Sequence, residues 1–153
     1  MKSDKKAFTI RVYGLIINAS QEVLIAEEMY KGRPMVKFPG GGLHWGESTI
    51  DCLKRECMEE LGVAVEIGAH FYTTDFFIAS AFDNQVQLVS IYYEVIAPAN
   101  FQPESRALNR QAVEDEVFRF VPISDLQAGS FFTFPIDQKV GNMLEKRLRL
   151  TGT

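Results

Sequence analysis

The sequence predicts an α/β fold in which helices cover both faces of a mixed β-sheet. Three observations support this: strand-like segments occur along the whole chain, a well-capped helix lies between them, and an amphipathic helix closes the chain. The chain has 153 residues and contains neither internal repeats nor low-complexity linkers. This length is typical of one compact domain. We therefore expect a single domain over residues 1–153.

Two strands are predicted near the start of the chain. Residues 7–18 and 22–26 are rich in β-branched and apolar side chains, and the break between them is polar. These two runs read as a β-hairpin. The apolar stretch is interrupted by Arg11 and no small-residue cleavage site follows it, so we expect no export signal.

A loop, a short strand and a helix are predicted next. Residues 27–35 are polar and contain glycine and proline, which predicts a loop before a short strand over residues 36–38. A helix is predicted over residues 49–61, because Ser48 precedes it as a cap and Gly62 follows it as a terminator. This helix is the best-defined element of the sequence.

The second half of the chain predicts a long antiparallel pair, one further strand and a closing helix. Residues 63–82 and 85–97 are rich in apolar residues, and the Asp-Asn pair between them is a turn signal. Residues 98–111 read as an irregular loop. Residues 117–123 predict a strand, and residues 136–150 have the periodicity of an amphipathic helix.

Charge and cysteine content narrow the function classes. The formal net charge of −4 argues against a protein that grips nucleic acid by its phosphates, whereas a small nucleotide is compatible because a metal can supply positive charge. Cys52 and Cys57 point in different directions on the predicted helix and lack the partners of a zinc site, so a reducing cytoplasmic setting fits. No apolar run reaches about 18 residues, so we expect no membrane span.

The predicted helix carries an acidic face. At about 100° per residue, Glu59 and Glu60 lie on either side of Glu56, within roughly 60° of it. An acidic face is usually only a solvated surface, but like charges at this spacing repel unless cations compensate them. Magnesium suits such a face, because it prefers carboxylate oxygens and is often completed by substrate phosphates. The adjacent arc is apolar and consists of Ile50, Leu53, Cys57 and Leu61.

The segment from Gly41 to Val63 reads GGLHWGESTIDCLKRECMEELGV. It resembles the Nudix box: glycine, five residues, glutamate, seven residues, arginine-glutamate, an aliphatic residue, any residue, glutamate-glutamate, any residue, glycine, aliphatic. The matching positions are Gly41, Glu47, Arg55, Glu56, Glu59, Glu60, Gly62 and Val63. Cys57 departs from the usual aliphatic residue and reads as a packing variant. The resemblance covers 23 contiguous residues, about a sixth of the chain, plus the preceding Phe38-Pro39-Gly40.

This resemblance implies a Nudix-type α/β/α sandwich and a pyrophosphohydrolase. The implied reaction is hydrolysis of a diphosphate bond in a nucleoside diphosphate derivative or a nucleoside triphosphate, with Mg²⁺ or Mn²⁺ as cofactor. The implied alternative is a Nudix-fold module that senses a nucleotide or a partner without turnover. Such modules have commonly lost box glutamates, and none is missing here.

The resemblance also implies roles for individual residues. It assigns metal binding or water activation to Glu56, Glu59 and Glu60. A backbone carbonyl at Gly40 or Gly41 is an expected further ligand in the substrate site, and Glu47 and Arg55 brace the loop and the helix. The general base is a box glutamate or one from a distant loop, for which Glu116 is our candidate.

Residues outside the box are candidates for substrate contacts. Trp45 reads equally well as a residue that stacks on a base and as one that packs beneath the glycine turn. Arg33, Tyr30 and the aromatic run at residues 131–134 are further candidates, although such a run is more typical of a surface that docks the last helix. Both histidines read as structural residues.

The substrate itself stays open. The proline that suggests ADP-ribose enzymes is absent near Ile78, and residues 79–81 lack the tyrosine that suggests dinucleoside polyphosphates. We expect a cytoplasmic protein with a nucleotide-type substrate and with neither a nucleic-acid nor a membrane partner. Exposed strand edges and the habit of the family are compatible with a homodimer.

Overall fold

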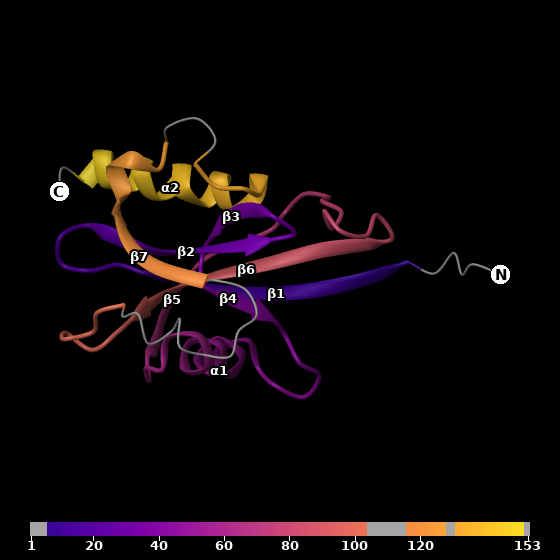
Figure 1. Cartoon of the computed structure of the whole chain (residues 1–153), viewed down its shortest axis with the longest axis horizontal. Coiled ribbons are helices and arrows are strands. Elements are labelled where there is room, and N and C mark those ends of the chain that lie inside the picture. The colour runs from indigo at the N-terminus through magenta and orange to yellow at the C-terminus, as the bar shows by residue number, and fades with distance from the viewer. Residues whose placement is uncertain (1–5, 104–115, 128–130, 152–153) are drawn as a thin grey trace.

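The computed structural model describes residues 6–103, 116–127 and 131–151 of the chain. Two β-sheets form its middle, and helices α1 (Thr49–Leu61) and α2 (Pro135–Thr151) lie on opposite sides of them (Figure 1). The α/β class with a mixed sheet and flanking helices is therefore confirmed. Within the described residues, no helix is long and apolar enough to cross a membrane.

The larger sheet is mixed and has the strand order β4-β1-β6-β5. Its strands are β1 (Ala7–Ile16), β4 (Gly40–Gly42), β5 (Glu66–Thr73) and β6 (Val86–Ile96). β1 runs parallel to β6 over its whole length, whereas β4 and β5 pair antiparallel with their neighbours. The antiparallel pair predicted from residues 63–82 and 85–97 is confirmed, but β5 is shorter than expected. The glycines after Pro39 form a strand instead of only ending one.

The smaller sheet is antiparallel and has the order β3-β2-β7. Its strands are β2 (Glu22–Tyr30), β3 (Arg33–Lys37) and β7 (Glu116–Pro122). The loop predicted over residues 27–35 is wrong, because a turn at Lys31 and Gly32 joins two paired strands there. Both turn residues have positive φ, 51° and 79°, which matches the twist of a two-residue hairpin. Pro34 is tolerated because β3 is an edge strand.

The hairpin predicted from residues 7–18 and 22–26 is also wrong. β1 and β2 belong to different sheets and are joined only by an isolated bridge between Ile17 and Val23. Both edges of β1 are occupied, by β4 and by β6, so β2 pairs with β3 and β7 instead. Runs that are apolar on both faces are typical of central strands, and their pattern does not indicate which strand pairs with which.

Helix α1 has the bounds that the sequence predicts. The Ser48 side chain accepts a hydrogen bond from the backbone N–H of Asp51 at 3.0 Å, and Gly62 ends the helix in the left-handed conformation with φ 66°. The expected apolar arc is buried except for Ile50, which is 42% exposed. This correction has a geometric reason: side chains tilt toward the helix N-terminus, so a first-turn side chain points beyond the packed turns.

Two hydrophobic clusters hold the helices against the sheets. On the α2 side, Tyr13 and Leu15 of β1 share a cluster with Tyr92 of β6. On the α1 side, Val12 and Ile16 of the same strand pack in a cluster with residues of the helix. The alternation along β1 is the period of two expected for a strand with both faces covered. Anchored in this way, α1 presents its polar face to the loop that precedes it.

Candidate active site

The glycine strand β4 brings the backbone close to both β1 and helix α1. Gly40 has φ 147°, and a Cβ atom there would collide with the backbone of Val12 and Tyr13. A Cβ atom on Gly41 would collide with the carboxylate of Glu56. The absence of side chains therefore lets β4 pack against β1 at Gly40 and lets the Glu56 carboxylate lie directly against Gly41.

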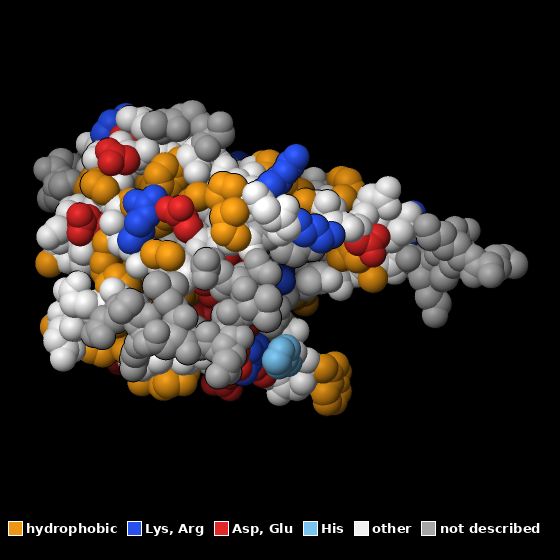
Figure 2. Space-filling view, in the orientation of Figure 1, with side chains coloured by type: hydrophobic (Ala, Val, Ile, Leu, Met, Phe, Trp, Pro, Cys, Tyr) orange, Lys and Arg blue, Asp and Glu red, His pale blue; other side chains and the backbone are white. Residues whose placement is uncertain are grey.

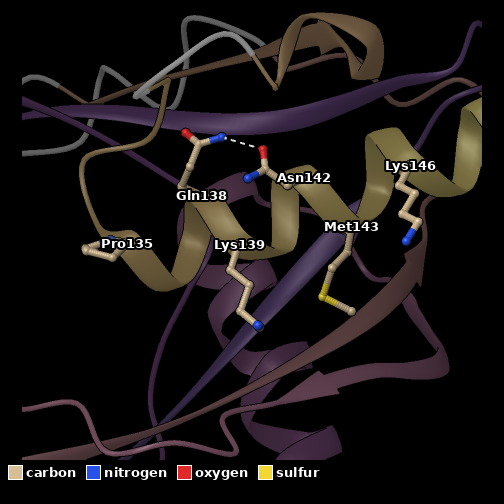
Figure 3. A pocket seen from close by; sticks show the side chains of 6 residues that line it. All are labelled: Pro135, Gln138, Lys139, Asn142, Met143 and Lys146. Carbon is tan, nitrogen blue, oxygen red and sulfur yellow. Dashed lines mark hydrogen bonds between the residues drawn. The ribbon is translucent and has the colours of Figure 1, made fainter.

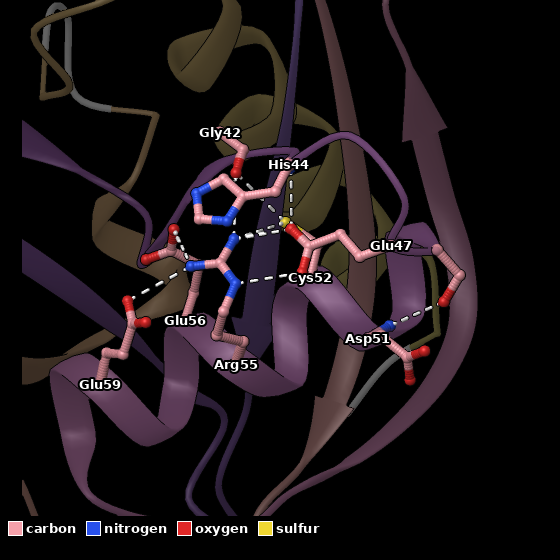
Figure 4. Close-up of polar contacts among 9 residues, drawn as sticks. Gly42, His44, Glu47, Asp51, Cys52, Arg55, Glu56 and Glu59 are labelled. Carbon is pink, nitrogen blue, oxygen red and sulfur yellow. Dashed lines mark hydrogen bonds and ion pairs between the residues drawn. The ribbon is translucent and has the colours of Figure 1, made fainter.

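Arg55 joins the box loop to helix α1 (Figure 4). Its guanidinium donates two hydrogen bonds to the Glu47 carboxylate, at 2.7 and 3.1 Å, and one to the carbonyl oxygen of Gly42 at 3.1 Å. On its other side it donates to Glu56 at 3.2 Å and to Glu59 at 3.3 Å. The hydrogen bond from Arg55, followed by one from the backbone N–H of His44, lowers the pKa of Glu47 to about 2. The network holds the loop in a single geometry.

The three helix glutamates differ in their surroundings. The Glu59 side chain is 56% exposed, and that of Glu56 is 13% exposed. Burial raises the pKa of Glu60 well above its usual range, and the nearby carboxylates of Glu116 and Glu56 raise it further, against the opposing effect of Lys37. Carboxylates from α1 and from the start of β7 thus meet at one place.

These residues fit a hard divalent cation. The glutamate oxygens and the backbone carbonyls of β4 are the ligands that Mg²⁺ and Mn²⁺ prefer, and Glu60 is held among like charges that a cation would neutralise. Within the described residues, no three His, Cys, Asp or Glu side chains are already gathered into a metal site. Glu56 and Glu59 instead contact Arg55.

A cavity of about 700 Å³ opens beside the glutamates, between the two sheets and the start of α2. Arg11, Tyr13 and Lys37 line it, and the charges of Arg11 and Lys37 interact with Glu60. Asp137 lines it too, and accepts a hydrogen bond from the Tyr92 hydroxyl at 2.5 Å. None of these residues is among the site residues predicted from the sequence. The available signal is Arg11, because it is a charge within an otherwise apolar strand.

The other residues predicted for the site differ in their exposure and in whether they line the cavity. Trp45 is fully exposed on the loop between β4 and α1, so the prediction that it packs beneath the glycines is wrong. Figure 2 shows hydrophobic side-chain atoms, next to a histidine, at the end of the projection below the sheets. Arg33 is exposed and does not line the cavity, and the side chain of Tyr30 lies outside the described part of the structure. In the aromatic run, Phe132 is buried in the core, whereas Phe134 lines the cavity.

A second hollow, of about 480 Å³, lies on the outer surface of α2 (Figure 3). It is lined by Pro135, Gln138, Lys139, Asn142, Met143 and Lys146, and Gln138 donates a hydrogen bond to Asn142 at 2.9 Å. It contains no carboxylate, and α2 lies across the sheets from α1 (Figure 1). This hollow is therefore separate from the glutamate site.

Comparison with known proteins agrees with this geometry. The family model described as the NUDIX domain matches residues 7–139. A MutT protein from Methanosarcina mazei Go1 superposes with a TM-score of 0.70 at 18% identity, covering 93% of this chain and 96% of that one. A NUDIX hydrolase from Nitrosomonas europaea superposes with a TM-score of 0.69 at 20% identity, covering 92% of this chain and 89% of that one.

A structure from a study of MutT from Aliivibrio salmonicida and Vibrio cholerae gives a TM-score of 0.64 at 23% identity, covering 92% of this chain and 98% of that one. No curated protein sequence gives a significant match. The structural likenesses show the fold, and the family match extends over most of the chain. The chain belongs to the Nudix family.

Proposed function

We propose that this chain hydrolyses a diphosphate bond in a nucleoside diphosphate derivative or a nucleoside triphosphate, with Mg²⁺ or Mn²⁺. The observation that carries the proposal is that the Glu56 carboxylate lies against Gly41 of β4, while Glu60 interacts electrostatically with both Glu56 and Glu116. When bound, the metal neutralises charge on the phosphates and lowers the pKa of water, as in other metal-assisted hydrolyses. The family match supports hydrolase chemistry in general.

Each residue of the site has a proposed task. Glu56 and Glu60 hold the metal, together with Glu59 once its side chain turns from Arg55, and the Gly40 or Gly41 carbonyl adds a ligand. Arg55 and Glu47 position the loop and Glu56 through their hydrogen bonds. Glu116 accepts a proton from the attacking water, because it interacts electrostatically with Glu60.

The remaining sequence predictions are carried forward with this proposal. Trp45 and Arg33 are candidates for contacts with the outer part of the substrate, because both are exposed. The homodimer, the cytoplasmic location and the absence of nucleic-acid and membrane partners stay predictions. Sedimentation velocity of the purified protein tests the homodimer.

The decisive experiment is a phosphate-release screen with and without Mg²⁺ or Mn²⁺, coupled to a second enzyme because the hydrolysis yields pyrophosphate or phosphomonoesters. Pyrophosphatase is added for the nucleoside triphosphates, and a phosphomonoesterase is added for the other compounds. The panel contains nucleoside triphosphates, sugar nucleotides, ADP-ribose and dinucleoside polyphosphates. We expect metal-dependent release from at least one compound, and loss of release in Glu60→Gln. Glu66→Gln is the matched control, because Glu66 is an exposed glutamate of β5 outside the site. No release from the whole panel, with nucleotide binding retained, would favour the sensing module instead.

A further inference from the structure

Two cations line the cavity beside the glutamates, and they differ in their partners. Lys37 forms an ion pair with Glu28 at 2.6 Å. Arg11 forms no ion pair within the described residues, although it is partly buried. A partly buried cation without a paired anion is costly, so its retention needs a reason. Arg11 is therefore the cation that is available to an anionic ligand.

Arg11 is held in place by Tyr13, two residues further along the same face of β1. The Nε atom of Arg11 donates a hydrogen bond to the Tyr13 hydroxyl at 2.6 Å, and the guanidinium carbon lies 5.6 Å from the centre of the Tyr13 ring. This leaves the two terminal nitrogens of the guanidinium for other partners. One of them, Nη1, lies 3.7 Å from the position that a Cβ atom on Gly42 would take. The guanidinium therefore lies beside the box glycines.

Arg11 also lies within electrostatic reach of the glutamates. Burial alone would lower its pKa, but Tyr13 and then Glu56 and Glu60 outweigh this, so the pKa of Arg11 is raised. Its charge is permanent at any working pH. When a divalent metal offsets the charge of the glutamates, Arg11 retains an electrostatic interaction with Asp137, and its terminal nitrogens can bind an anion of the substrate. A guanidinium matches phosphate oxygens well, because its donors are planar and can bind two oxygens together.

The cavity beyond Arg11 has the composition of a site for a flat organic group. Met35, Leu88 and Phe134 provide apolar walls, and Ser90 and Asp137 provide polar atoms. Its volume of about 700 Å³ falls within the range of roughly 300–1,000 Å³ that is usual for small-molecule pockets. A nucleobase suits this arrangement, since it has aromatic faces for the walls and a hydrogen-bonding edge for the polar atoms.

We propose that Arg11 binds a phosphate oxygen of the substrate and directs the nucleoside joined to that phosphate into this cavity. The diphosphate then lies between the glutamates and Arg11, with its organic end away from helix α1. This inference rests on the proposed function, because it needs a diphosphate at the glutamates. It adds to the proposed function the residue that contacts the phosphate from the cavity side.

The test compares Arg11→Met and Arg11→Lys with the wild type, on the best substrate of the phosphate-release screen and on inorganic tripolyphosphate. Losing a charge-assisted hydrogen bond should raise KM by about tenfold or more in Arg11→Met. The KM of Arg11→Lys should lie between those of the wild type and Arg11→Met, because lysine keeps the charge but loses the planar donors. Arg147→Met is the matched control, since this arginine of α2 pairs with Glu94 and does not line the cavity.

The wild type should also have a kcat/KM at least about tenfold higher for the nucleotide than for tripolyphosphate, because only the nucleotide fills the cavity. Equal use of the two compounds, or an unchanged KM in a folded Arg11→Met variant, would overturn the inference. Melting curves establish folding, and if Arg11→Met does not fold, the KM of Arg11→Lys decides.

The outcome for Arg11 can be separated from that for the proposed function. If no compound is hydrolysed, the proposed function fails, and calorimetric binding of an α,β-methylene nucleoside triphosphate then tests Arg11 directly. Binding about tenfold weaker in Arg11→Met supports the inference. Equal binding in both proteins, or no binding to either, contradicts it.

Discussion

The polar face of helix α1 has two halves with opposite electrostatics. On one side, Arg55 contacts Glu47, Glu56 and Glu59, and every one of these carboxylates has a cation as its partner. On the other side, Glu60 lies among carboxylates that raise its pKa, with Lys37 as the opposing charge. In the first half, Arg55 compensates the carboxylate charges when no metal is bound. The second half resembles a binding site, because its charges need a cation that the described residues do not fully supply.

The largest expected effect comes from neutralising the second half. Glu60→Gln should lower metal-dependent turnover by about two or more orders of magnitude, because a metal ligand is lost. The same change should raise the melting temperature of the metal-free protein, since it removes a charge from among like charges. Steady-state kinetics and thermal unfolding in EDTA measure the two effects. Turnover within about threefold of the wild type would refute the assignment of Glu60.

Glu59→Gln tests the other half, because Glu59 lies on the Arg55 side. The turnover of this variant should also fall strongly if Glu59 binds the metal. Unlike Glu60→Gln, the variant should lose slight stability without metal, about 0–1 kcal/mol, because an exposed ion pair is lost. A stabilising effect of this variant, measured in the same EDTA experiments, would show that the two halves do not differ.

Asp137 is a buried carboxyl group outside helix α1 and tests whether burial alone produces a pH effect. Burial raises its pKa from 3.8 to about 7, against the opposing hydrogen bond from Tyr92. The folded state then binds an extra proton between these values, so the free energy of unfolding falls as pH rises from about 4 to above 7. Asp137→Asn removes this loss. Relative to the wild type, the variant should gain about 2–4 kcal/mol between pH 4 and pH 8.

Urea unfolding at several pH values measures this difference. The matched control is Asp75→Asn, because Asp75 also accepts a hydrogen bond from a tyrosine hydroxyl, that of Tyr72 at 2.6 Å, but is exposed. A difference between Asp137→Asn and the wild type that stays constant with pH would show that burial does not govern this carboxyl group.

A smaller effect is expected from Arg55→Lys, which acts on the first half. Lysine keeps the positive charge but cannot replace the planar set of hydrogen bonds to Glu47, Gly42 and Glu56. We expect a loss of about 1 kcal/mol of stability and about tenfold in kcat, because Glu56 and the loop lose their support. Arg149→Lys is the control, since it changes an ion pair with Glu145 on α2. Equal effects of both changes would mean that Arg55 forms only an ordinary surface ion pair.

The smallest effect is expected from Cys57→Val, on the buried side of the same helix. Cys57 is buried, and burial followed by Glu60 and Glu56 raises the pKa of its thiol to about 12. It therefore acts as a small apolar side chain, and valine should change stability by less than about 1.5 kcal/mol and leave kcat unchanged. A large fall in kcat without a loss of stability would give the thiol a chemical role that its burial argues against.

The local features of the site could be predicted from the sequence. Helix α1 has the bounds set by Ser48 and Gly62, because caps act through neighbouring residues. The contact of Arg55 with Glu47 joins positions eight residues apart in the box pattern. Glu116 is different: its place near Glu60 was only a candidate from the sequence, since it depends on how β7 pairs with β2.

What the sequence determined by itself was the helix and its acidic face, because these depend on contacts between residues close together in the chain. The tertiary structure decided the division into two sheets, since strands that are apolar on both faces carry little information about their partners. It also decided the cavity and the setting of Arg11. β1 pairs parallel with β6 and antiparallel with β4. Only this arrangement lets Arg11 line the cavity and also interact with the glutamates.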